Sequence, residues 1–339
     1  MIPPYSWRAE ARRRRRRRLT RTIAGAVVLA VLAIFAIPRL FGRGGHGVFS
    51  PSRPSAGTTP GPSPTAPAPA AAVPTTLGSP PPLKIAPVGK GLPTPMSRAQ
   101  AVPDGATLLI LGGLVGGRSS AGVRRFDPAS GAVSAAGTLS VATHDTASVI
   151  SGTRALLFGG GEATTIDTVQ TFGPNGSQVV GHLPQPRSDL VAASIGGRYY
   201  VLGGFDGKTE TPDVLMTTDG VSFHVVTKLP TPVRYAGIGV VGSTIYLVGG
   251  EHQGTQTSQI QAVDVAAGTA KVVSNLPVPL SHESVFVLGG AMFFAGGRSG
   301  ATTRTQVDVL DPGTGTLTRA GVLPRPTAGH RVSIGGGSS

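Results

Sequence analysis

From residue 92 onward, the apolar positions of the chain fall into short runs that turn residues separate. Ile238–Val241 and Ile245–Val248 are two such runs, rich in β-branched residues and joined by a turn at Gly242. A third run follows at Val263–Val265, and a fourth leads back to the next leucine. Short β-rich runs bounded by glycine, proline and aspartate predict strands. The pattern therefore predicts an all-β region in which four short strands form one unit.

This unit is repeated with constant internal spacing. Each copy has a leucine, a glycine thirteen positions later and a glycine pair seven positions after that. The leucines are Leu92, Leu139, Leu183, Leu229, Leu276 and Leu323, and the single glycines are Gly105, Gly152, Gly196, Gly242, Gly289 and Gly336. The paired glycines are Gly112, Gly113, Gly159, Gly160, Gly203, Gly204, Gly249, Gly250, Gly296 and Gly297. Four strands repeated every 44 to 47 residues describe the blades of a β-propeller.

The glycine pairs have a structural interpretation. We expect each pair to end the second strand of its blade, where neighbouring blades crowd together and a side chain would clash. Five copies are complete, and the sixth supplies only a first strand near Val332–Ile334. Leu83–Val88 is similar to the predicted fourth strands, such as Leu317–Val322, which precede the repeated leucines. We therefore predict about six blades, five complete and one reduced blade closed by the two termini; a strict ring of five is the alternative.

At this point the sequence resembles the Kelch repeat family. The stretch Tyr246–Gly250 and the turn at Phe126–Pro128 match the family's Gly-Gly after the second strand and Asp-Pro turn after the third. The resemblance covers roughly residues 83 to 337 and implies a Kelch-type propeller that serves as an interaction platform. The family's fourth-strand tryptophan is missing, because the only tryptophan is Trp7. Smaller residues, Val133 and Leu317, stand near that position, so lighter packing between blades is expected.

The N-terminal region has a different composition. An uncharged apolar stretch, residues 22–38, follows the run Arg12–Arg18 and is close to the shortest length that spans a bilayer. With flanking arginines that snorkel to the interfaces, the sequence predicts a cytoplasmic basic tail at 1–21 and one transmembrane helix at 22–41. A cleaved secretory signal is the main alternative, although no small-residue cleavage site follows the apolar core. A nucleic-acid-binding arm at Arg12–Arg18 is a weaker alternative.

The segment between anchor and repeats is predicted to be disordered. Residues 44–82 are rich in proline, serine and threonine and contain no acidic group, so they cannot bury enough apolar surface to fold. We expect them to form a semi-rigid spacer that carries the propeller domain, residues 83–339, outside the cytoplasm. Most of the net charge of +14 belongs to the anchor, because residues 1–43 hold eleven arginines against one glutamate. No nucleic-acid partner is therefore expected for the propeller.

Candidate binding residues occur five, six and seven positions after each leucine. If the first strand of each blade lines a central channel, these positions lie at its mouth, on the same face as the loops after the glycine pairs. The candidates are Arg98, His144, Asp145, Asp189, Arg234, Tyr235, His282, Glu283 and His330. Such a ring could hold a sugar or a small acid through charge-assisted hydrogen bonds. The alternative is that these side chains only pair with neighbouring blades.

The sequence limits the chemistry that this face can perform. The chain has no cysteine, which excludes disulfides, thiolate metal sites and the cysteine-linked copper radical of galactose oxidase. The histidines stand singly, without metal-binding spacing, so neither a metal nor another cofactor is expected. We expect the propeller to bind a protein, a glycan or an envelope component rather than to catalyse. A carbohydrate enzyme of the sugar-mutarotase type, a role that also occurs among Kelch-like propellers, is the alternative.

Overall fold

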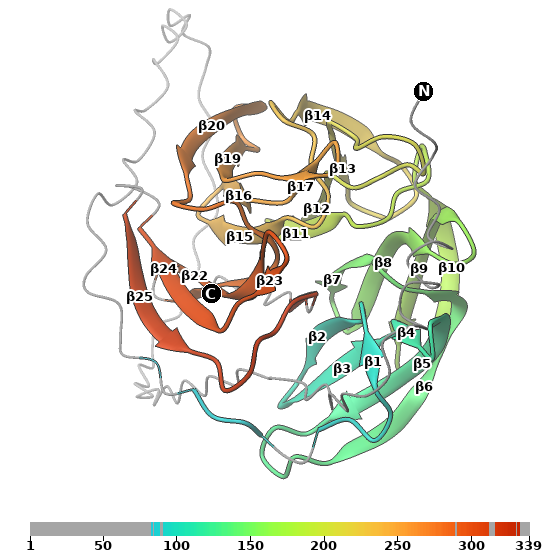
Figure 1. The fold of residues 1–339 in the computed structure, drawn as a ribbon. Helices are drawn as coiled ribbons and strands as arrows, with labels where there is room; N and C mark the ends of the chain where they lie inside the picture. Colours follow the sequence, from blue (N-terminus) through green and yellow to red (C-terminus); the bar gives the residue numbers. More distant parts are fainter. Residues whose placement is uncertain are drawn as a thin grey trace, which may run out of the picture.

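The computed structural model describes residues 83, 85–88, 91–288, 290–311, 316–329 and 331–332. Within these residues, five blades of four antiparallel strands stand around a central axis (Figure 1). All of their regular structure is β, which confirms the prediction of an all-β propeller. No helix in the described part of the chain is long and apolar enough to cross a membrane. The predicted tail, transmembrane helix and spacer (1–21, 22–41 and 44–82) lie outside the described residues.

Each blade is one continuous stretch of chain whose strands run in order from the axis to the rim. Blade I contains β2 (Gln100–Asp104), β3 (Thr107–Leu111), β5 (Arg118–Phe126) and β6 (Val133–Thr143). Blade II contains β7 (Ala147–Ser151), β8 (Arg154–Gly161), β9 (Thr165–Gly173) and β10 (Gly176–His182). Blade III contains β11 (Val191–Ile195), β12 (Arg198–Leu202), β13 (Asp213–Thr217) and β14 (His224–Lys228).

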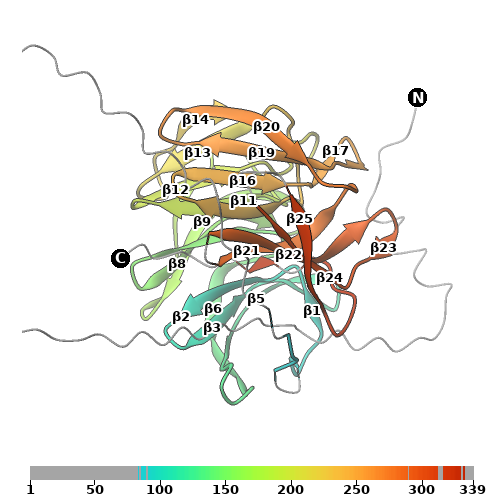
Figure 2. The same ribbon diagram turned by 90° about the vertical axis from the view of Figure 1, so that its left-hand side faces the viewer.

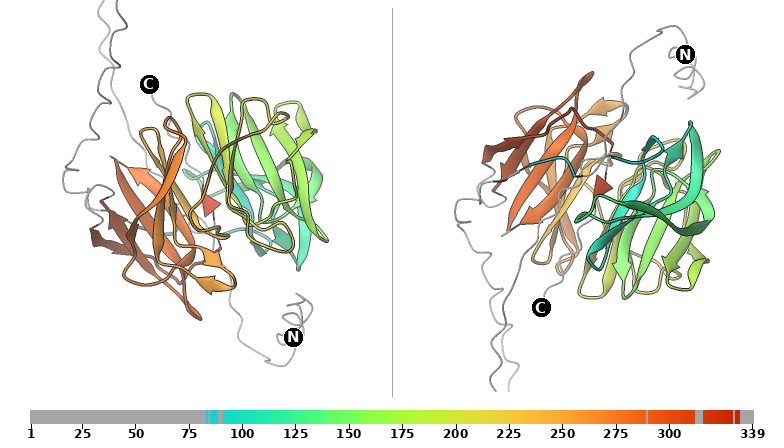
Figure 3. Two further views of the ribbon diagram at one scale, coloured as in Figure 1. Left: turned by 90° about the horizontal axis from the view of Figure 1, so that it is seen from above. Right: turned by 90° about the horizontal axis from the view of Figure 1, so that it is seen from below.

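Blades IV and V follow the same plan and lie across the axis from blades I and II (Figure 3). Blade IV contains β15 (Gly237–Val241), β16 (Thr244–Val248), β19 (Gln259–Asp264) and β20 (Thr269–Asn275). Blade V contains β21 (Ser281–Leu288), β22 (Ala291–Ser299), β24 (Gln306–Leu310) and β25 (Leu317–Val322). Short extra strands are β1 (Met96–Ser97), β4 (Leu114–Val115), β17 (Glu251–His252), β18 (Thr255–Gln256), β23 (Thr302–Thr303) and β26 (Arg331–Val332). The outermost strands β14 and β20 neighbour each other on the rim (Figure 2).

The hydrophobic core is divided among the interfaces between blades. One cluster joins blades II and III and contains Phe158, Leu183 and Val201, each at most 3% exposed. Leu183 is one of the repeated leucines, and its counterparts Leu139, Leu229, Leu276 and Leu323 are buried in the corresponding clusters. Burying a leucine contributes roughly 1.5–3 kcal/mol. The period of the sequence is therefore the period at which one blade packs on the next.

Neighbouring blades approach each other closely at the glycine pairs, as predicted, but the second strand ends at the pair only in blades I, III and IV, because β8 and β22 continue through theirs. A Cβ on Gly249 would collide with the carbonyl oxygen of Leu280 in the segment that enters the next blade. Gly249 also has a φ of +57°, which disfavours any side chain. The N–H of Gly250 donates to the same carbonyl at 2.8 Å. The same arrangement occurs at all five pairs, so each pair joins two blades through the main chain.

Two buried glutamines also join blades. Gln170 in β9 accepts a hydrogen bond from the N–H of Val141 and donates one to its carbonyl, at 3.0 and 2.9 Å. Gln261 in β19 makes the same pair of bonds with Thr231. Val141 and Thr231 both lie two residues after a repeated leucine, in the segments that lead to the channel mouth. The glutamines therefore fix these two entry segments.

The ring closes without a separate sixth sheet, so the described residues form the strict ring of five blades and the prediction of about six blades was wrong. The last described strand, β26, pairs in parallel with β2 of blade I and also contacts β21 of blade V. Leu83 and residues 85–88 form no strand, contrary to the prediction. Leu83 and Ile85 pack against blade V, whereas Val88 and Leu92 pack against blade I. A fourth strand needs a third strand to pair with, and the described residues of the closing copy include none, so the apolar side chains of Leu83, Ile85 and Val88 cover the seam instead.

Candidate functional site

Six residues with left-handed backbone surround one end of the channel, and we call them the mouth ring. They are Arg98 (φ 59°), Asp145 (φ 51°), Asp189 (φ 58°), Tyr235 (φ 57°), His282 (φ 62°) and Gly329 (φ 80°). Each lies six positions after a repeated leucine. From Asp145 to Gly329, the N–H of each member donates to the carbonyl of the preceding member at 2.9–3.1 Å. The sixth copy of the repeat therefore contributes to the ring although it forms no blade.

The conformation of the ring is costly for most of its residues. A left-handed backbone suits glycine and is tolerated by aspartate, but it costs other residues roughly 1–2 kcal/mol. Arg98, Tyr235 and His282 adopt it nonetheless, and only Gly329 has the residue that the backbone prefers. Strain of this kind is concentrated at functional sites.

The loops after the glycine pairs lie on the same face as the ring, as expected. In each blade, the residue before the ring member is paired across strands with the residue two positions after the first glycine of the blade's glycine pair. These cross-strand pairs are Ser97 with Leu114, His144 with Gly161, Ser188 with Phe205, Arg234 with Glu251, and Ser281 with Arg298. The outer wall of the mouth is thus built from pairs that differ from blade to blade.

A first polar group joins blades I and II. Arg98 Nη1 lies 2.7 Å from Asp145 Oδ2, and His144 Nε2 lies 3.8 Å from the same oxygen. Ser119 Oγ is 2.9 Å from His144 Nδ1. The imidazole lies against Gly161, where an added Cβ would be 2.7 Å from His144 Cε1. Burial lowers the pKa of His144 and outweighs the opposing charge of Asp145, so the His144 imidazole is neutral at pH 7.

A second polar group joins blades III and IV around Arg234. Its guanidinium lies 3.6–3.9 Å from three carboxylates and 5.0–5.1 Å from the centres of two aromatic rings. The carboxylates are Asp189, Glu210 and Glu251, and the rings are Phe205 and Tyr235. One cation therefore faces three anions at this side of the mouth.

An aromatic pair links this group to blade V. The rings of Tyr235 and His282 stack with their centroids 4.0 Å apart. His282 Nδ1 is 3.0 Å from Ser281 Oγ and 3.8 Å from Glu251 Oε1. Burial raises the pKa of Tyr235, and the charges of Asp189 and Asp145 raise it further. The phenol therefore stays protonated and can both donate and accept a hydrogen bond.

Members of the two groups and the aromatic pair converge on one small pocket at the mouth. It is lined by Arg98, Ala99, Gln100, Asp145, Tyr235, His282 and Gly329. The space in it for the centres of water molecules is about 10 Å³, roughly what one water needs. Only a small group can enter without movement of the side chains.

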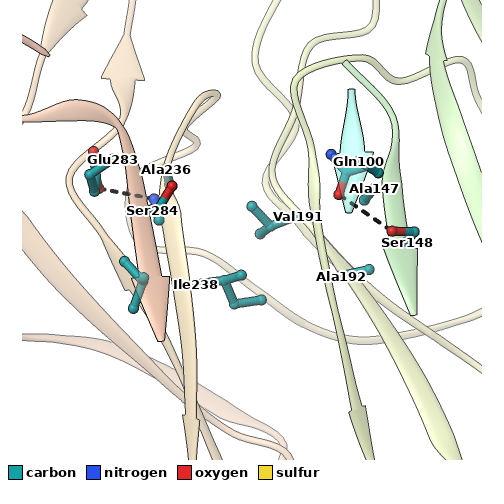
Figure 4. A pocket seen from close by; sticks show the side chains of 11 residues that line it. Gln100, Ala147, Ser148, Val191, Ala192, Ala236, Ile238, Glu283 and Ser284 are labelled. Carbon is teal, nitrogen blue, oxygen red and sulfur yellow. Dashed lines mark hydrogen bonds between the residues drawn. The ribbon is translucent and has the colours of Figure 1, made fainter. Parts of the chain in front are cut away.

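The channel continues below this pocket between the innermost strands (Figure 4). Gln100 lines both spaces, and Ser148 and Glu283 line the channel from opposite sides. Glu283 Oε1 accepts the N–H of Gly237 at 3.0 Å, and Ser148 Oγ donates to Gln100 Oε1 at 3.4 Å. The walls are otherwise mostly small or apolar, with Ala147, Val191 and Ala236 among them. The prediction that first strands line the channel is confirmed.

The structure brings most of the predicted site residues together. Arg98, Asp145, Tyr235 and His282 line the mouth pocket, with Asp189 in the same ring. His144 and Arg234 stand beside the pocket, and Glu283 lies deeper, in the channel. His330 lies outside the described residues. Whether these residues bind a ligand stays a prediction.

Two polar residues of the mouth were missed from the sequence. Gln100 occupies a position that is Ala147, Val191 and Gly237 in the next three copies and Ser284 in the fifth, so a large polar residue where these copies have small or apolar ones was an available signal. Ser119 has no such signal, because its contact with His144 depends on how two blades meet.

Comparisons with known proteins support the fold only. No family model matches the sequence, and no curated protein matches it. Among solved structures, one titled "Structure of YjhT" superposes with a TM-score of 0.62 over 72% of this chain and 89% of that chain. Its sequence identity is 15%. The chain is therefore similar to that protein in fold.

Proposed function

We propose that this chain is a membrane-anchored, extracytoplasmic binding module whose mouth ring presents a site to a glycan, a protein or another envelope component. The Arg-rich start and the apolar stretch at 22–41 support the anchor, and the composition of 44–82 supports a spacer. The resemblance to Kelch repeats supports a binding role. The observation that carries the proposal is the mouth ring, in which costly side chains occupy positions that suit glycine.

A purely structural role explains the ring less well. Arg98 and Asp145 do tie blade I to blade II, and Arg234 lies near Asp189 of the neighbouring repeat. Gly329, however, makes the same main-chain bond to its neighbour, His282, without any side chain. The backbone links already hold the ring together. The side chains at the other positions are then best explained by contact with something outside the protein.

The test compares binding with stability. Arg98→Gly relieves the left-handed strain and removes a part-exposed ion pair worth roughly 0.2–1 kcal/mol, so the melting temperature should change by only a few degrees. Saturation-transfer NMR on the full-length chain, with a panel of sugars, oligosaccharides and peptides, would identify compounds that bind. We expect those compounds to lose their signal with Arg98→Gly and keep it with Arg125→Ala. The latter breaks an exposed ion pair with Asp104 at the opposite end of β2. Compounds whose binding no ring substitution affects would contradict the proposal.

One observation favours an enzyme of the sugar-mutarotase type as the second candidate. Arg98, Asp145, Tyr235 and His282 line one pocket, so groups able to donate and accept a proton meet there. Such an enzyme would accelerate the exchange between sugar anomers, which NMR exchange spectroscopy measures directly. Acceleration that Asp145→Asn abolishes, with sugar binding retained, would favour this candidate over a binding module.

A further inference from the structure

The mouth pocket contains two uncharged polar groups that the protein leaves available. The Tyr235 hydroxyl makes no hydrogen bond among the described residues. The Gln100 side chain is 3% exposed, and its only bond in the described part of the chain is the one from Ser148 to its oxygen. Figure 4 shows its amide nitrogen turned away from Ser148, toward the channel. If the amide is flipped, the oxygen faces the channel instead, and a polar atom is available in either case. Neither atom is among the fully enclosed side-chain atoms that lack a partner, so each faces open space in which water or a ligand group can bond to it.

The charged groups around the pocket, by contrast, compensate one another. Arg98 is paired with Asp145 at 2.7 Å, and Arg234 is surrounded by three carboxylates. Among the described residues of these two groups, four carboxylates face two guanidinium groups. Three further cations on this face of the described chain, Arg118, Lys208 and Arg298, are exposed, so solvent screens them. Among the side chains that the structure describes, a ligand carboxylate would therefore find no uncompensated cation in the pocket.

The electrostatic field at the pocket acts against negative charge. Burial is the largest cause of the raised pKa of Tyr235, and among the charges Asp189 and Asp145, which raise it, outweigh Arg98 and Arg234, which lower it. The same field that disfavours a phenolate at this point disfavours a bound carboxylate. The pocket has room for about one water-sized group, so a single hydroxyl fits while the rest of a ligand lies over the mouth.

From these observations we infer that the mouth pocket takes a neutral, hydroxyl-bearing ligand and discriminates against its carboxylate analogues. A hydroxyl inserted between Tyr235 and Gln100 can donate and accept, which suits a phenol and an amide together. A hexose with its hydroxymethyl arm has this chemistry. The inference rests on the proposed binding role of the mouth and names the ligand class for it.

Matched pairs of sugars test the inference. Glucose and glucuronate, galactose and galacturonate, and mannose and mannuronate differ by a carboxylate in place of the hydroxymethyl group. Isothermal titration of the full-length chain should show binding of at least one neutral hexose, with its uronate at least about tenfold weaker. Tyr235→Phe keeps the stacked ring but removes the hydroxyl, and should weaken the neutral sugar about tenfold. Tyr246→Phe, in β16 and away from the mouth, is the matched control and should leave affinity unchanged.

A second variant tests the electrostatic part. Asp145→Asn tolerates the left-handed backbone and leaves Arg98 without its carboxylate, so the preference for the neutral sugar should shrink. Uronates that bind as well as the hexoses, or a Tyr235→Phe variant with unchanged affinity, would overturn the inference. If no hexose binds but other compounds depend on the ring, the ligand class is wrong and the binding role stands. If no compound depends on the ring, both fail.

Discussion

Replacing Gln170 by leucine should weaken the contact between blades I and II and lower the free energy of unfolding by about 2 kcal/mol. Gln170 is 1% exposed and bonds both the N–H and the carbonyl of Val141, at 3.0 and 2.9 Å. Leucine fills a similar volume but leaves both main-chain groups without this partner. Each lost bond is worth roughly 1 kcal/mol net. Val141 is partly exposed, so water can replace part of the lost bonding and the cost stays near the sum of two ordinary bonds.

Urea unfolding of the full-length chain measures this effect. With a slope of roughly 1–3 kcal/mol/M, a loss of about 2 kcal/mol lowers the midpoint by on the order of 1 M at constant slope. Gln261→Leu should cost about as much, because Gln261 makes the same bonds to Thr231. Gln178→Leu, exposed on β10, is the control and should change stability by less than about 0.5 kcal/mol. If Gln170→Leu and Gln178→Leu had the same midpoint, the glutamines would not join the blades as argued.

Three further predictions follow from the packing and the titration of the mouth. Gly249→Ala should cost roughly 3 kcal/mol or prevent folding, because its Cβ meets the Leu280 carbonyl. Gly254→Ala, with φ +76° and open space around it, should cost only about 1–2 kcal/mol. Equal melting temperatures of the Gly249→Ala and Gly254→Ala variants would contradict a clash between the added Cβ and the Leu280 carbonyl. Gly161→Ala should push the His144 imidazole toward solvent and raise its pKa, measured by NMR titration, and an unchanged titration would show that the glycine does not seat the histidine. Because the pKa of His144 is lowered on folding, the unfolded state binds the extra proton first, so stability should fall as pH drops below about 6.5. His144→Asn should reduce this slope in pH-dependent melts, whereas substitution of the exposed His224 by asparagine should leave it intact.

The sequence predicts the blade framework well because that framework is periodic. The leucine column, the turn at Gly242 and the glycine pairs each recur at a fixed spacing, and apart from the partly buried Leu92 the described members of each column share one environment. The strand predicted at Leu83–Val88 was wrong because similarity to Leu317–Val322 says nothing about whether a partner strand is present. Gln170 and Ser119 were missed for a related reason, since their contacts join different blades.

The mouth combines a constant backbone with variable side chains. Every ring member uses the same left-handed conformation and the same bond to its neighbour, so the ring itself does not depend on which side chain is present. The adjoining cross-strand pairs vary in matched ways: His144 fits because residue 161 is glycine, and Arg234 faces the carboxylate of Glu251. Since the framework already holds with Gly329 in the sixth place, the arginine, tyrosine and histidine elsewhere in the ring add strain without being needed for closure. Their retention is most simply explained by what they contact at the open end of the channel, which is why the mouth, and not the rim, is where binding should be sought.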